Sequence, residues 1–297
     1  MPVAQTRNFG KVLFWMIGSL LSFCAIAVSI RALQNTLTIF EILSLRNLGG
    51  LVILGAMALV VPDPSQRLAP VRPRIHILRN TIHFVGQALW AYGVTVLPLA
   101  TVFAVEFTSP AWVALLAVIF LKERMSWPRA AALVLGFAGV LVILRPGMES
   151  FRPASLAVAA AAFCFGVQLT TTKFLTGSNS TWTILFWMNV MQWPINMLAN
   201  MAIGEPFWFY GKLSLDLWLP LLGILVCGLT AHYCVTNAFR YGDAIVVTPI
   251  DFLRVPLIGI VGWLFYAEQP ELAVWVGAGI VMIGVFTNIY FESRARA

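Results

Sequence analysis

Long apolar runs repeat along the whole chain and are separated by short breaks rich in charge, proline or glycine. An α-helix needs about 20 apolar residues to cross the hydrocarbon core of a bilayer. Of the 297 residues, 60% are hydrophobic and 10% are charged, whereas soluble domains carry roughly 45–50% apolar and about 25% charged residues. This composition excludes a soluble globular domain, a disordered chain and a secreted disulfide scaffold. The runs predict an all-α integral membrane protein with ten transmembrane helices, near residues 12–31, 42–61, 79–97, 99–121, 130–145, 154–175, 182–203, 217–239, 244–266 and 272–291.

The basic residues predict how the chain sits in the membrane. Most of the 19 Lys and Arg residues fall in breaks on the same side as the N-terminus, and an excess of Lys and Arg marks the cytoplasmic side. We therefore expect an inner-membrane protein with both termini in the cytoplasm and with the first run retained as a span. The net charge of +7 is spread over short loops without a basic stripe, which argues against a nucleic-acid partner. The four cysteines lie inside apolar runs without a C-x-x-C pair, so we expect free thiols and no metal site.

An internal repeat appears when the sequence is shifted by 145 positions. The shift aligns Glu106 with Asp251, Glu123 with Glu268 and Gly139 with Gly284. It implies two halves, residues 1–150 and 151–297, each with five spans. Because five is odd, the second half enters the membrane from the opposite side, which makes an inverted repeat of the kind found in carriers. The alternative is a chance alignment of helices built from the same few apolar residue types.

Several short motifs carry a family resemblance. They are Arg46, the run from His76 to Arg79 (HILR), the run from Trp90 to Gly93 (WAYG), the run from Phe120 to Arg124 (FLKER) and the run from Gly136 to Val140 (GFAGV). With them the chain resembles the drug/metabolite transporter superfamily, and within it the ten-span EamA-type members. The resemblance covers the whole chain and implies a central cavity lined mainly by spans 3, 4, 8 and 9, with help from spans 1, 2, 6 and 7. It implies neither a metal nor nucleotide hydrolysis. Members of the superfamily export amino acids and other metabolites, or import S-adenosylmethionine, riboflavin or sugars.

Three ionisable residues inside predicted spans are candidates for substrate binding: Glu106, Asp251 and Arg254. Ionisable groups in a span are costly and by default face a cavity or a partner. At 1.5 Å per residue, the two acids lie about 6 Å from the bilayer midplane on opposite sides, and Arg254 lies almost at the midplane. We hypothesise that Arg254 holds a substrate carboxylate or another anion while Glu106 attracts an ammonium group. The alternative is an ion pair between Asp251 and Arg254, at i and i+3, that only holds the helix in place.

Prolines occur beside these acids in both halves of the chain. Pro110 follows Glu106, and Pro249 and Pro256 flank Asp251. A proline inside a helix removes a backbone donor and kinks the helix, and helix breaks at matching places in two repeats indicate the binding region of a carrier. The alternative is that these prolines are simply tolerated in membrane helices.

Further candidates come from polar and aromatic side chains at helical spacing. His83, Gln87 and Trp90 share one face at i, i+4 and i+7, which lines a cavity or packs as a polar stripe against a neighbouring helix. Tyr233 and Asn237 share a face in span 8, and Trp112 is a candidate wall in span 4. We expect four other polar groups to hold the structure together instead: His232 by packing, Glu123 and Glu268 at helix ends, and the stripe of Asn189, Gln192 and Asn196 between helices.

Together these features predict a secondary transporter that works by alternating access between the two halves. No nucleophile–base pair, metal cluster or phosphate-binding loop appears, so we expect no enzymatic activity and no cofactor. One acid with one arginine suits a zwitterion, which favours export of an amino acid or a related metabolite. The alternatives are uptake or exchange of S-adenosylmethionine, riboflavin or another metabolite, and a channel. Protons are a candidate coupling ion through Glu106, Asp251 or His83, and we expect a monomer or a weak dimer in contact with lipid.

Overall fold

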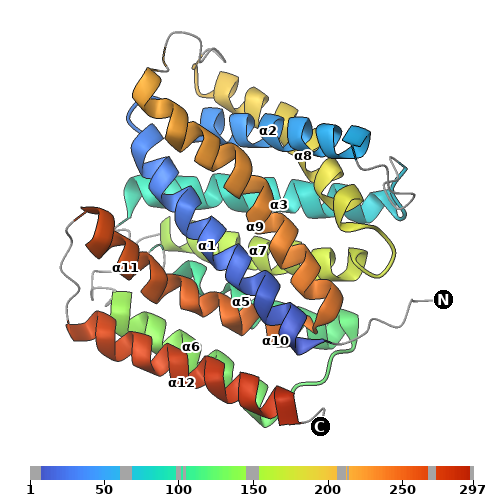
Figure 1. The fold of residues 1–297 in the computed structure, drawn as a ribbon, viewed down its shortest axis with the longest axis vertical. Helices are drawn as coiled ribbons and strands as arrows, with labels where there is room; N and C mark the ends of the chain where they lie inside the picture. Colours follow the sequence, from blue (N-terminus) through green and yellow to red (C-terminus); the bar gives the residue numbers. More distant parts are fainter. Residues whose placement is uncertain are drawn as a thin grey trace.

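The computed structural model describes residues 8–60, 69–97, 102, 105–144, 154–205, 212, 214–266 and 272–294, and within these ranges it contains helices and turns but no strand (Figure 1). The α-helices are α1 (Phe9–Leu33), α2 (Ile39–Val60), α3 (Pro73–Val96), α5 (Ser109–Leu116), α6 (Trp127–Leu144), α7 (Ala154–Leu175), α8 (Thr181–Ala202), α9 (Trp218–Tyr241), α10 (Ala244–Val247), α11 (Arg254–Tyr266) and α12 (Leu272–Arg294). A π-helix, η1 (Ala117–Leu121), continues α5, and two 3₁₀ helices are η2 (Leu215–Leu217) and η3 (Thr248–Leu253).

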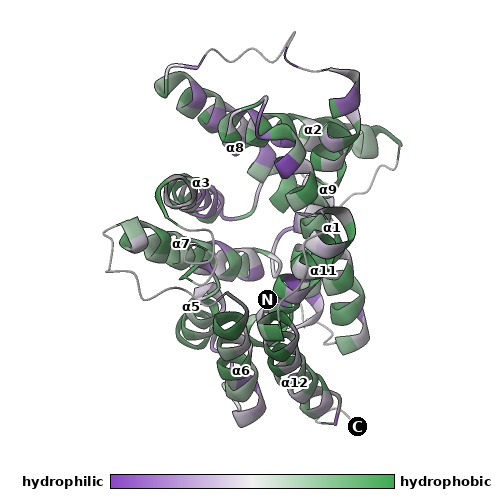
Figure 2. Cartoon of the chain, turned by 90° about the vertical axis from the view of Figure 1, so that its left-hand side faces the viewer, coloured by the Kyte–Doolittle hydropathy of each residue, from purple (hydrophilic) through white to green (hydrophobic). Residues whose placement is uncertain are grey.

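The helices confirm the prediction of an all-α, multi-pass membrane protein. Six helical segments in the described ranges are long and apolar enough to cross a bilayer, and α5 with η1 and α6 are shorter apolar helices. Figure 2 shows hydrophobic residues dominating α6, α7 and α12, whereas α3 and α8 carry hydrophilic ones. Large apolar side chains also cover the outside, for example Leu59 and Trp127, each 85% exposed. Such a surface suits lipid, because soluble proteins rarely expose large contiguous apolar patches.

Helix starts in this chain follow ordinary capping chemistry. The Asn8 side chain accepts a hydrogen bond from the backbone N–H of Lys11 at the start of α1. Thr38 and Glu41 form a reciprocal capping box at the start of α2, in which each side chain accepts from the other residue's backbone N–H. Glu41 is also held by Lys212 Nζ at 2.9 Å. These caps define where the apolar runs become helices.

The predicted span 244–266 is helical throughout, but it is not α-helical throughout. It is divided into α10, the 3₁₀ segment η3 and α11, and Pro249 is the second residue of η3. Pro256 lies in the first turn of α11, as Pro110 lies in the first turn of α5. Proline is tolerated in a first turn because its missing N–H would have no partner there. The three prolines therefore lie where a helical segment begins or changes type. That they kink these helices at a binding region stays a prediction.

Each long helix packs closely against a partner from the other half of the chain: α1 on α9, α3 on α7, α2 on α8 and α6 on α12 (Figure 1). Helices α2 and α8 are antiparallel, because Thr38 bonds to Asn200 near one end while Trp182 bonds to the carbonyl of Leu54 near the other. Glycines allow α6 and α12 to approach closely. A Cβ at Gly139 would lie 2.6 Å from the carbonyl oxygen of Gly277.

Three predictions lie outside the described residues. Glu268 falls in the segment 267–271, and the start of the predicted span 99–121 falls in residues 98–101 and 103–104. The boundary between the halves, near residue 150, lies in the segment 145–153.

Candidate functional site

A cavity of about 240 Å³ lies in the interior between the helices. Its lining comes from α1, α2, α3, α5, α7, α9, α10, η3 and α11, together with Glu106. Along α1 the lining residues extend from Met16 to Ile30, which is about 21 Å at 1.5 Å per residue. The cavity is therefore long and narrow, and its volume is slightly below the range of about 300–1,000 Å³ typical of ligand pockets.

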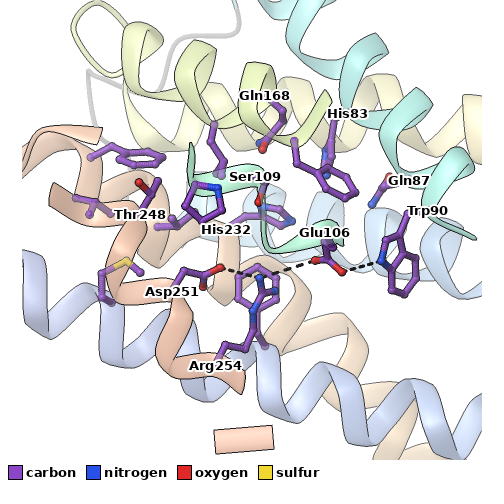
Figure 3. A pocket seen from close by; sticks show the side chains of 18 of the residues that line it. His83, Gln87, Trp90, Glu106, Ser109, Gln168, His232, Thr248, Asp251 and Arg254 are labelled. Carbon is purple, nitrogen blue, oxygen red and sulfur yellow. Dashed lines mark hydrogen bonds and ion pairs between the residues drawn. The ribbon is translucent and has the colours of Figure 1, made fainter. Parts of the chain in front are cut away.

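An acid–arginine cluster forms one part of the wall (Figure 3). Arg254 Nη2 lies 2.6 Å from Asp251 Oδ2 and 4.0 Å from Glu106 Oε1, and the indole N–H of Trp90 donates to Glu106 Oε2 at 2.7 Å. The guanidinium also lies over the Phe23 ring, 4.8 Å from its centroid. With both acids ionised, this cluster carries one net negative charge. The contact between Asp251 and Arg254 is the i, i+3 ion pair that the sequence left as an alternative.

A second set of polar side chains in the cavity wall centres on Arg46 of α2. Arg46 Nη2 donates to Asn47 Oδ1 and to Gln192 Oε1, both at 3.4 Å. Gln192 Nε2 in turn donates to His83 Nδ1 at 2.6 Å. The His83 ring meets the His232 ring edge to face, with centroids 5.7 Å apart.

The structure brings together most of the predicted site residues. Seven of them line the cavity: His83, Gln87, Trp90, Glu106, Pro110, Asp251 and Arg254. The Oε1 atom of Gln87 is buried and has no hydrogen-bond partner in the part of the chain that the structure describes, so an acceptor is available at the wall.

Three predicted wall residues do not line this cavity. Tyr233 packs its ring against Trp15, and Asn237 accepts a hydrogen bond from Thr181 Oγ1 at 3.0 Å. Trp112 packs against Phe163 and is 36% exposed. Pro249 and Pro256 are likewise absent from the lining. The residues of α9 that line the cavity are His232, Val235 and Phe239. At about 100° per residue they lie on a face turned by about 150° from that of Tyr233 and Asn237.

The sequence interpretation missed several cavity residues: Arg46, Ser109, Gln168, His232 and Thr248. Arg46 is an ionisable residue inside a span, so the criterion that selected Arg254 would have found it. His232 lines the cavity in addition to packing against Phe23 and His83. For the small polar residues Ser109 and Thr248, the sequence carries no distinguishing signal.

One end of the cavity, near the start of α1 and the end of α9, is closed by packed apolar side chains. Val12, Met16 and Phe239 are each at most 1% exposed there and belong to one hydrophobic cluster. Behind this cluster Lys173 Nζ donates to the backbone carbonyls of Phe239 and Gly242, both at 2.6 Å. The lining residues Ile30 and Ile39 lie at the opposite end, so the cavity extends away from the side of the N-terminus.

Glu123 anchors helix ends at this closed side, as expected. Its two carboxylate oxygens accept the backbone N–H groups of Ala244 at 2.8 Å and Ile245 at 3.0 Å, which open α10. Burial raises the pKa of the Glu123 carboxyl, and the two amide donors act in the opposite direction. Next to it, Arg129 forms an ion pair with Asp243 at 3.3 Å. In the described ranges no three His, Cys, Asp or Glu side chains are grouped so that they could hold a metal ion.

Comparison with known proteins agrees with this architecture. The profile of the EamA-like transporter family matches residues 10–145 and again residues 152–290. The riboflavin transporter of Brucella anthropi is 30% identical over 226 residues, which cover 76% of this chain and 80% of the relative. The S-adenosylmethionine uptake transporter of Rickettsia conorii is 29% identical over 282 residues, covering 95% of this chain and 93% of the relative.

A solved crystal structure shares the fold, with a TM-score of 0.76 over 95% of this chain and 99% of its own chain at 18% identity. The two family matches span nearly the whole sequence, and the relatives are transporters rather than enzymes. The chain belongs to the EamA-like transporter family of the drug/metabolite transporter superfamily.

Proposed function

We propose that this protein is a secondary carrier that moves a small charged metabolite across the membrane by alternating access, with S-adenosylmethionine as the first substrate to test. The observation that carries the proposal is the cavity deep among apolar helices, whose wall holds the acid–arginine cluster of Glu106, Asp251 and Arg254. Charged groups at membrane depth are costly unless they face a cavity and serve a ligand or one another.

The proposal includes an inverted repeat of residues 1–150 and 151–297. In such a repeat α1 corresponds to α7, α2 to α8, α3 to α9 and α6 to α12. Exchanging the corresponding helices turns the pair α1–α9 into the pair α7–α3 and leaves the pairs α2–α8 and α6–α12 unchanged. All four pairs are in contact. The glycine contacts between α6 and α12 support the same relation. A Cβ at Gly139 would meet Gly277 and Val281, and a Cβ at Gly284 would meet Ala132 and Gly136, which are the same contacts after a shift of 145.

These glycine contacts also support the inversion. As the residue number rises along α6 from Ala132 to Gly139, the contacted residue on α12 falls from Gly284 to Gly277, so the two helices are antiparallel. A two-fold axis that relates two antiparallel helices is perpendicular to them. Because membrane-spanning helices run roughly along the membrane normal, this axis lies in the plane of the membrane. The family profile, matching once in each half, supports the same duplication.

The substrate is inferred from the chemistry of the cavity and the relatives. S-adenosylmethionine carries a sulfonium and an ammonium group, and both suit the net negative acid–arginine cluster. It also carries a carboxylate, and an adenine ring that can stack on the aromatic wall of Trp90 and Phe165. Riboflavin carries no charge, and its uptake is the second candidate because a relative at 30% identity is a riboflavin transporter. Export of an amino acid, the first expectation from the sequence, has no support from either of these relatives.

The direction of opening follows from the predicted orientation. With the N-terminus in the cytoplasm, the packed end at Val12 and Phe239 is the cytoplasmic end, and the cavity extends toward the outside. Uptake then requires this end to open. Coupling to protons through Glu106 or Asp251 is part of the proposal, and dependence of uptake on a pH gradient tests it.

The experiment is uptake of radiolabelled S-adenosylmethionine and of riboflavin into proteoliposomes that contain the purified protein. A carrier gives saturable uptake that unlabelled substrate inhibits. Uptake that rises linearly with concentration would favour a channel. No uptake of either compound above empty liposomes would refute the substrate assignment.

A further inference from the structure

Two buried arginines of this protein differ in how well their donors are satisfied. Arg79, fully buried outside the cavity lining, donates to Thr172 Oγ1 at 2.6 Å and to Asn80 Oδ1 at 2.7 Å. Arg46 is only 8% exposed and forms part of the cavity wall. Among the residues that the structure describes, it makes two hydrogen bonds, both at 3.4 Å, and its Nε has no partner. Bonds from a guanidinium to a good acceptor are normally about 2.7–2.9 Å long. Arg46 is therefore under-coordinated at a place where a ligand can reach it.

The charge around Arg46 is also unbalanced. The acids that line the cavity, Glu106 and Asp251, are both engaged by Arg254. Across the described ranges, no Asp or Glu pairs with Arg46, whose hydrogen-bond acceptors are the neutral amides of Asn47 and Gln192. A buried charge without a counter-ion is unfavourable, so the wall at Arg46 favours an anionic ligand group.

The position of Arg46 is prepared by its neighbours. Gly228 of α9 leaves room for its aliphatic stem, since a Cβ there would overlap Arg46 Cγ. Gln192 bridges Arg46 and His83, so the guanidinium is held beside the two histidine rings. Arginine recognises carboxylates with a planar pair of donors, which a lysine cannot reproduce.

We propose that Arg46 is the subsite for the carboxylate of the transported molecule, whose cationic centre lies at the cluster of Glu106, Asp251 and Arg254. This inference rests on the proposed transport function and narrows its substrates to metabolites that carry both a carboxylate and a cation. It replaces the hypothesis that Arg254 holds the anion, because Arg254 is already neutralised by two carboxylates.

The test compares ligands that differ only in the carboxylate. Binding of S-adenosylmethionine and of its decarboxylated analogue is measured by calorimetry on the purified full-length protein, alongside L-methionine and methioninamide. The wild-type protein should bind the carboxylate member of each pair roughly 10- to 100-fold more tightly, as expected for a hydrogen bond to a charged group. In R46M this difference should disappear, and in R46K it should shrink but persist.

The ligand pairs decide the question even where R46M does not fold, because they are compared on the wild-type protein. Equal affinity within both pairs, or no binding of either carboxylate, overturns the inference. A difference that survives unchanged in folded R46M overturns it as well. If riboflavin is taken up saturably while the carboxylates do not bind, the transport proposal stands and only the Arg46 assignment fails.

Discussion

Removing the positive charge of Arg254 should destabilise the protein unless a neighbouring negative charge is removed with it. In R254Q, Asp251 and Glu106 remain inside the cavity wall without their counter-ion, which contacts them at 2.6 and 4.0 Å. Two unit charges 4 Å apart interact by about 4 kcal/mol at an effective dielectric constant of 20. Breaking a buried pair by removing one partner costs about 3–5 kcal/mol. Because the side chains of Arg254 and Asp251 are 23% and 25% exposed, we expect R254Q to lose less than this, about 2–3 kcal/mol of the free energy of unfolding.

The double variant D251N/R254Q separates a structural role of this pair from a binding role. It leaves Glu106 with its hydrogen bond from Trp90 and keeps one net negative charge in the cluster. We expect it to be about 1–3 kcal/mol more stable than R254Q and to retain saturable uptake of S-adenosylmethionine. D251N alone makes the cluster neutral and should fold but bind the substrate more weakly.

The assay is denaturant unfolding in mixed micelles, followed by uptake into proteoliposomes for each variant that folds. If R254Q is as stable as the wild-type protein, or if the double variant is no more stable than R254Q, then Arg254 does not stabilise the protein by neutralising these two acids. A stable double variant without uptake would show instead that Arg254 itself binds the substrate.

Three other substitutions test separate parts of the structure. E106Q should weaken binding of S-adenosylmethionine about 10- to 100-fold, measured by calorimetry, because the cluster loses its net charge; unchanged affinity would contradict the placement of the cation. G139A should cost about 1–3 kcal/mol in thermal unfolding, because its Cβ would press on the backbone of α12, 2.6 Å from the Gly277 carbonyl oxygen. The control G279A, where nothing lies within 4 Å, should leave the melting temperature unchanged. E123Q should speed hydrogen exchange at the amides of Ala244 and Ile245, which donate to that carboxylate, while E205Q should not; equal exchange in both variants would remove Glu123 as an anchor.

Helix positions and the ionisable wall residues were predictable because each depends on local chemistry. A run of apolar residues must become a helix in lipid, and a charge such as Asp251 inside such a run must face a cavity or a partner. The rotation of a helix about its axis depends on packing, and the sequence does not contain it locally. Tyr233 and Asn237 were placed on the cavity face of α9, whereas His232 and Phe239 occupy it.

Arg46 shows a different limit of the sequence. It is an ionisable residue in a span like Arg254, but only the structure shows that Arg254 contacts two acids, whereas Arg46 contacts none within the described ranges. Which charges compensate one another depends on contacts between helices far apart in the chain, such as the contact between Arg46 and Gln192. The start of α10 has a similar cause, because its first two backbone N–H groups donate to the carboxylate of Glu123, which lies between η1 and α6.

Substrate that occupies the cavity should protect a cysteine introduced at Ser109 from labelling. Ser109 lines the cavity (Figure 3), whereas Ser126 is exposed outside it. In a background without the four native cysteines, S109C should react with a hydrophilic thiol reagent, and saturating S-adenosylmethionine should slow the reaction several-fold without affecting S126C. An S109C that does not react, or that reacts at the same rate with saturating S-adenosylmethionine and with saturating riboflavin as without them, would contradict the account.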